Sequence, residues 1–177
     1  METRWLTDDE RAVWLRLVAV VELLPGVLDA QLRAGAGLTH FEYFVLAMLS
    51  EAPERTLRMT ALAQRTTATL QRLSHVVRRL EDRGLVKRYP CPEDGRATNA
   101  RLTQAGWEAV VAAAPGHVDT VRRHVLDPLT PVQLQQLRGI GDALLQGLDP
   151  NGRLTGLYDP HRDPEATSAA ADDPAVG

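Results

Sequence analysis

Polar side chains that could read nucleic-acid bases recur along one face of the stretch 69–83. At about 100° per residue of an α-helix, the outward side and its flanks carry Gln71, Arg72, Ser74, His75 and Arg78. Arginine can bind guanine through two hydrogen bonds, and glutamine can bind adenine in the same way. No acidic residue lies between Gln71 and Arg79, whereas solvated helix faces usually mix both signs of charge. We interpret this face as a reader of the DNA major groove, with a solvated basic surface as the alternative.

The same stretch also indicates how this helix is held in place. Its opposite side is apolar and is expected to face a core: Leu70, Leu73, Val76, Val77 and Leu80. Thr69 is a predicted N-cap that can also contact a DNA phosphate, and Gly84 provides the left-handed residue after the helix. A short helix over 59–65 precedes it across a tight turn, which predicts a helix-turn-helix.

A β-hairpin is predicted directly after this helix, from strands over 85–89 and 97–102 joined by a turn rich in proline and glycine. Its strands carry basic residues suited to DNA phosphates: Lys87, Arg88 and Arg101. At the tip, Arg96 is expected to enter the minor groove, with the Asp94 carboxylate orienting its guanidinium. A surface turn in which Asp94 pairs with Arg96 only for solubility is the alternative.

The charge distribution agrees with a localised surface for a polyanion. The whole chain has a net charge of −3, yet the window 55–101 holds 11 Lys and Arg residues against 4 acidic ones. The basic window is therefore flanked by acidic segments, as expected of a chain that binds nucleic acid through one region only.

The remaining elements are predicted helices. Capping-box spacings begin helices after Thr7, Thr39 and Thr130, and Thr103 begins another long helix. The pair Pro25–Gly26 predicts a kink or break in the first of them, because proline removes a helical hydrogen bond. The fold class is thus mainly α with a β-hairpin wing, a winged helix-turn-helix with additional helices at both ends.

These terminal helices carry more apolar surface than a small DNA-reading unit needs. The last one, for example, has a continuous apolar face made by Leu134, Leu137, Ile140, Leu144, Leu145 and Leu148. We expect part of this surface to be buried against a second copy of the chain, which predicts a homodimer. Two-fold symmetry would then set the reading helices about 34–36 Å apart, on inverted-repeat half-sites.

Four segments resemble the MarR family of regulators (multiple antibiotic resistance regulators), in the family's order. They read LRMTALA (57–63), RRLEDRGLVKR (78–88), PEDGR (92–96) and LTQAG (102–106). One departure is Gly95, where many relatives have a second basic residue at the wing tip. The resemblance implies an obligate homodimer on a pseudo-palindromic operator, transcriptional repression, and release by a small aromatic or phenolic ligand.

The resemblance also sets the expected domain organisation. One domain over 8–148 comprises a DNA-reading part at 54–103 and dimerisation helices at 8–34 and 103–148. The composition of 150–177, with few apolar residues, predicts a disordered tail.

Two other groups of residues have competing interpretations. The resemblance implies an effector pocket that Trp14, His40, Tyr43 and Trp107 could line; the competing interpretation is helix capping for His40 and core packing for the three aromatic residues. Cys91 lies near basic residues that could activate its thiol, which suggests a redox-sensing regulator; a small turn residue is the alternative.

Several classes of protein are disfavoured. The chain lacks a phosphate-binding glycine loop, a nucleophile elbow and a zincin motif, so we expect no enzyme, and we expect no cofactor. His117, Asp119 and His124 have no compelling metal-ligand spacing. A single cysteine and no long apolar run fit a cytoplasmic protein. A winged helix that binds an acidic protein partner remains the alternative function.

Overall fold

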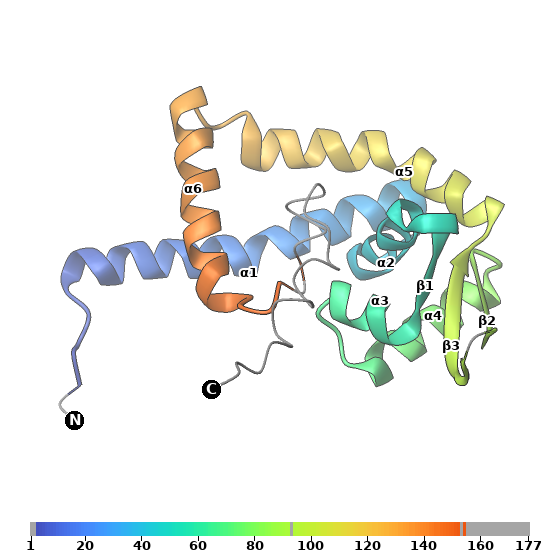
Figure 1. Cartoon of the computed structure of the whole chain (residues 1–177). Coiled ribbons are helices and arrows are strands. Elements are labelled where there is room, and N and C mark those ends of the chain that lie inside the picture. Colours follow the sequence, from blue (N-terminus) through green and yellow to red (C-terminus); the bar gives the residue numbers. More distant parts are fainter. Residues whose placement is uncertain (1–2, 93, 153, 155–177) are drawn as a thin grey trace, which may run out of the picture.

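The computed structural model describes residues 3–92, 94–152 and 154. It has two parts, a head that contains the sheet and three helices, and an arm of long helices that extends from it (Figure 1). Within the described residues, no helix is long and apolar enough to span a membrane. Apart from 150–152 and 154, the predicted disordered tail lies outside the described residues.

The first helix, α1 (Asp8–Ala36), joins the arm to the head. It begins with the predicted capping box between Thr7 and Glu10. The predicted break at Pro25–Gly26 is wrong, because α1 continues through Pro25 without interruption. Pro25 and Val21 are both exposed, so the carbonyl that proline leaves unbonded can be hydrated. The C-terminal part of α1 then enters the core through Leu28 and Leu32.

The head is a winged helix-turn-helix, as the sequence predicts. Its helices are α2 (His40–Glu51), α3 (Met59–Arg65) and α4 (Leu70–Asp82). Its strands are β1 (Thr56–Arg58), β2 (Val86–Cys91) and β3 (Asp94–Leu102), in the antiparallel order β1-β3-β2. The hairpin of β2 and β3 was predicted, but β1, which pairs with the other side of β3, was not.

The core of the head is formed where α2, α3 and α4 meet the sheet and the end of α1. Among its fully buried side chains are Leu32, Leu38, Val45, Leu46, Leu49, Leu62, Leu73, Val77 and Leu80. The predicted apolar side of α4 is confirmed at four of five positions. Leu70 is the exception, with 47% of its surface exposed, because it faces the gap between α4 and the wing instead of the core.

The arm is completed by α5 (Gln104–Val121), a π-helical segment η2 (Arg122–Leu126) and α6 (Pro131–Leu148). The α5 helix packs along α1, and Figure 1 shows α6 crossing toward α1 at the far end of the arm. The predicted buried face of α6 is not buried within one chain, since no α6 residue is buried. An apolar groove of about 650 Å³ instead lies between α1, η2 and α6.

Candidate nucleic-acid interface

Helix α4 presents the predicted polar face to solvent. Gln71, His75 and Arg78 are exposed, whereas Ser74 is half-buried beside the wing. The N-cap is confirmed, because the hydroxyl of Thr69 accepts a hydrogen bond of 3.2 Å from the backbone N–H of Arg72. The side chains that could read bases therefore project from a helix whose opposite face is fixed in the core.

Two arginines on the flanks of α4 point toward α2 instead of outward. The guanidinium of Arg72 lies 4.4 Å from the centre of the Phe41 ring, a cation–π contact. Arg79 donates a hydrogen bond of 2.6 Å to Glu42. Sequence analysis missed Glu42 because its position in a capping box already explained it, and Arg79 lies 37 residues away in the chain.

The basic residues of the wing lie on two faces of the sheet. Lys87 and Arg101 are register partners on β2 and β3, and both are exposed. Together with Arg55 they line an open basic pocket of about 480 Å³. Arg88 lies on the other face and forms an ion pair of 2.6 Å with Glu81 of α4. Arg88 thus connects the wing to α4 in the DNA-free chain.

The Glu81 carboxylate is held in its charged form by this connection. It accepts hydrogen bonds from the backbone N–H of Arg88, at 2.9 Å, and from its Nε, at 2.8 Å. These bonds lower the pKa of Glu81, with the backbone bond as the largest cause. The wing strand and the reading helix are consequently joined by both backbone and side-chain bonds.

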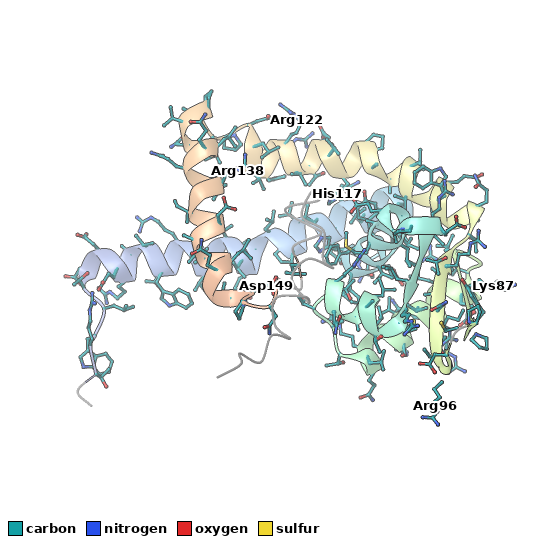
Figure 2. The ribbon with its side chains drawn as sticks, in the orientation of Figure 1. Lys87, Arg96, His117, Arg122, Arg138 and Asp149 are labelled. Atoms are coloured by element: carbon teal, nitrogen blue, oxygen red, sulfur yellow. The ribbon has the colours of Figure 1, made fainter. Side chains whose placement is uncertain are left out.

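Arg96 is at the end of the wing and points away from the head (Figure 2). The predicted role of Asp94 in orienting its guanidinium is not what the structure shows. The carboxylate of Asp94 accepts a hydrogen bond of 3.1 Å from the backbone N–H of Arg96. Asp94 therefore shapes the turn, and the exposed Arg96 side chain extends from it.

Between the wing and α4 lies a small groove, which accounts for the exposure of Leu70 and the partial exposure of Ser74. It has a volume of about 200 Å³ and is lined by Leu70 and Ser74 from α4 and by Arg88, Arg96 and Thr98 from the wing. An apolar side chain next to a hydroxyl at this position could contact a sugar or a thymine methyl group.

Cys91 does not lie in an exposed turn, as one interpretation expected, but at the end of β2. It is buried, with 4% of its surface exposed. Oxidation of a cysteine requires access of the oxidant to the thiolate, so this burial disfavours the redox-sensing alternative.

The structure does not bring the four proposed effector residues together. His40 and Tyr43 on α2 lie near His117 of α5, with ring centres of His117 and Tyr43 4.7 Å apart. Trp14 is 53% exposed on the distant half of α1, and Trp107 packs under the guanidinium of Arg55.

His117 was considered in the sequence only as a metal ligand. No group of residues that could hold a metal ion occurs in the described part of the chain. Partial burial lowers the pKa of both His117 and His40, so both rings favour the neutral form. His117 thus belongs to a ring cluster with His40 and Tyr43.

Comparisons with known proteins agree with this geometry. The model of the MarR family matches residues 36–97. The structure of Sco3205 from Streptomyces coelicolor, a MarR family transcriptional regulator in complex with DNA, is 46% identical with a TM-score of 0.81. The match covers 84% of this chain and 93% of Sco3205. The chain belongs to the MarR family. The family resemblance, the winged-helix fold and the expectation of a regulator instead of an enzyme are thereby confirmed.

Two further similar proteins give a consistent result. AbsC, another MarR family regulator from Streptomyces coelicolor, is 39% identical with a TM-score of 0.78, over 82% of this chain and 98% of AbsC. The HTH-type transcriptional repressor Rv2887 of Mycobacterium tuberculosis is 40% identical over 88 residues, or 46% of this chain. That alignment spans 62% of the repressor.

Proposed function

We propose that this MarR family protein is a homodimeric transcriptional repressor that binds a pseudo-palindromic DNA operator in the cytoplasm. The observation that carries the proposal is the exposed polar face of α4, which contains Gln71, His75 and Arg78 and no carboxylate between Gln71 and Arg79. Its relative Sco3205 forms a complex with DNA, which supports the same partner for this chain.

Each part of the surface has a separate role in this proposal. Gln71, His75 and Arg78 read base edges in the major groove, while Arg96 enters the minor groove. Lys87 and Arg101 bind phosphates, which adds affinity for any sequence. The DNA-reading part is 54–103, as the sequence suggests.

Arg72 and Arg88 have a different main role in this proposal from the DNA contacts that the sequence predicts. They are engaged by Phe41 and Glu81, so their main contribution is to hold α4 and the wing in place. In this proposal Arg72 and Arg88 keep these contacts and also touch the DNA backbone. Thr69 likewise touches the backbone while it caps α4.

A second copy of the chain is the proposed occupant of the apolar groove in the arm. Large apolar side chains from α1 and α6 remain at least 44% exposed in the single chain, including Val20, Leu23, Leu137, Ile140 and Leu144. Burying apolar surface is worth about 25 cal/mol per Å², so a groove of this composition favours association. The dimerisation helices of the proposal are those at 8–34 and 103–148.

Release by a small aromatic or phenolic compound is part of the proposal and rests on the family resemblance. In this proposal the compound binds where the rings of His40 and Tyr43 on α2 approach the ring of His117 on α5. Among the described residues, the ring contacts of these histidines do not include Trp14 or Trp107, and neither tryptophan is part of this candidate position.

The deciding experiment is a mobility-shift titration against the DNA upstream of the protein's own gene and against random duplex. A sequence-specific reader should prefer its own inverted repeat by about 10³-fold or more, with a steep dependence on salt. Equal affinity for both duplexes would instead favour the protein-interaction alternative. Repeating the titration with phenolic compounds, and with an oxidant on the wild type and Cys91→Ser, tests effector release and redox sensing.

A further inference from the structure

Glu42 is a buried carboxylate on the otherwise apolar inner side of α2. It is 4% exposed, and both of its oxygens are engaged. Oε2 accepts hydrogen bonds from the backbone N–H of Thr39, at 2.8 Å, and from its hydroxyl, at 3.0 Å. Oε1 accepts a hydrogen bond of 2.6 Å from Nη2 of Arg79, and Nη1 of Arg83 lies 3.9 Å from Oε2.

The capping role alone does not require a charged residue at this position. Helix α6 begins with the same arrangement made by a neutral amide. There the backbone N–H of Thr130 donates to Oε1 of Gln133 at 2.9 Å, and its hydroxyl lies at 3.0 Å. Burying a carboxylate instead of an amide is costly unless a cation compensates it. The cations that compensate Glu42 come from the last turn of α4, at Arg79, and from the residue that caps its C-terminal end, Arg83.

These two cations lie at the C-terminal end of α4, whereas Arg72 contacts Phe41 near the beginning of the same helix. Helix α4 is thus attached to α2 at two points along its length. Arg79 follows Arg78 by one residue, or about 100° of rotation. When Arg79 is directed to α2, Arg78 is directed to solvent.

We propose that Glu42 is a positioning residue that sets the rotation of the DNA-reading helix by holding Arg79 and Arg83. This inference rests on the proposed function, because rotation matters for the base contacts of Gln71, His75 and Arg78. Glu42 also prevents Arg79 from acting as an additional phosphate-binding cation. Loss of its charge lowers discrimination between sequences more than it lowers affinity for DNA in general.

The hydrogen-bonding state of Glu42 is consistent with this role. Burial by itself raises the pKa of a carboxyl group, but the bonds from Thr39 and Arg79 outweigh it and lower the pKa of Glu42. The carboxylate is therefore charged throughout the physiological range and available to both arginines.

The test is Glu42→Gln, with Glu10→Gln as the matched control. Both substitutions replace the glutamate of a capping box by the residue found in the box of α6, but Glu10 is in the exposed first turn of α1. For Glu42→Gln, the ratio of specific to random-duplex affinity should fall about 10-fold, comparable to the loss of one bidentate base contact. For Glu10→Gln the ratio should remain at the wild-type value.

A double-mutant cycle and a conservative variant separate positioning from a general effect on folding. Arg79→Met should reduce the ratio as Glu42→Gln does, and the double variant should reduce it no further than either substitution alone. Arg79→Lys, which keeps the cation opposite Glu42, should retain the ratio within about 3-fold. Additive losses in the cycle, or an unchanged ratio in Glu42→Gln, would overturn the inference.

Hydrogen exchange of the DNA-free protein gives a measurement that does not depend on operator binding. Glu42→Gln should accelerate exchange about 10-fold for amides over 76–83, with no change at the start of α6. Unchanged exchange over 76–83 in Glu42→Gln would overturn the inference about Glu42, whatever the result of the DNA titrations. A wild type that shows no preference for its own upstream DNA would overturn the proposed function.

Discussion

Gly106, in the first turn of α5, is packed against the backbone that leads into the wing. A Cβ built on it would lie 2.1 Å from the carbonyl oxygen of Leu85 and 2.7 Å from Cδ1 of Leu102. The same carbonyl accepts a hydrogen bond of 3.1 Å from the backbone N–H of Thr103, which caps α5, while the Thr103 hydroxyl lies 2.7 Å from the carbonyl oxygen of Gly84 and 3.1 Å from that of Leu85. Gly106→Ala therefore forces α5 away from the carbonyl to which its own N-cap is bonded.

The expected cost follows from the size of this overlap. Ordinary Cβ contacts begin near 3.4 Å, so the helix and the strand must separate by more than 1 Å. Overpacking of this kind costs about 1–3 kcal/mol, and weakening of the bonds that Thr103 donates to the backbone before the wing adds about 1 kcal/mol. The better helix propensity of alanine returns at most about 1 kcal/mol. We expect a net loss of about 1–3 kcal/mol in the free energy of unfolding.

Chemical denaturation followed by circular dichroism measures this loss, with Gly139→Ala as the control. Nothing lies within 4 Å of a Cβ built on Gly139, which is exposed inside α6. The control should be neutral or stabilised by up to about 1 kcal/mol. If Gly106→Ala were as stable as the wild type, the close packing of α5 on the wing would be refuted.

Three further predictions test the interface, the arm and the ring cluster. Arg78→Ala should cost about 1–3 kcal/mol of specific DNA binding and relax the preference at one base pair, measured by titration of operator variants; undiminished specific binding would contradict the assigned helix face. Leu137→Asp, in the apolar groove, should convert the dimer into monomers in sedimentation experiments, and an unchanged molecular mass would contradict the groove as the interface. Because the folded-state pKa values of His40 and His117 are lowered from 6.5, the unfolded chain binds protons more readily. The free energy of unfolding should therefore not be reduced by these histidines above pH 6.5 and should decrease as the pH falls below it. In thermal melts at pH 7.5 and 5.5, His117→Gln should show a smaller decrease than the wild type.

Features that depend on local sequence were predicted well. The caps at Thr7, Thr39, Thr69 and Thr130 each follow from a hydroxyl at the start of a helix, and all four are present. The rotation of α4 followed from its apolar spacing, since that spacing alone determines which side is buried.

Features that depend on partners distant in the chain were not predictable in the same way. The three residues of β1 are strand only because they pair with β3, where Thr56 lies opposite Arg101. Leu70 belongs to the apolar side of α4 by angle, but its surroundings are set by the wing. The pairing of Arg79 with Glu42 likewise requires knowledge of how α2 packs on α4.

The uninterrupted course of α1 has a mechanical consequence. With 29 residues and a rise of about 1.5 Å each, it is a rod of about 43 Å, clamped at one end by Leu28 and Leu32. From this clamp at Leu28 to Asp8 the rod spans about 30 Å, so a tilt of about 5° displaces Asp8 by about 2.6 Å, most of the height of one base-pair step along a duplex. In the proposed dimer, a small angular adjustment where the two arms meet would thus change the separation of the two heads by a distance on the scale of a base-pair step.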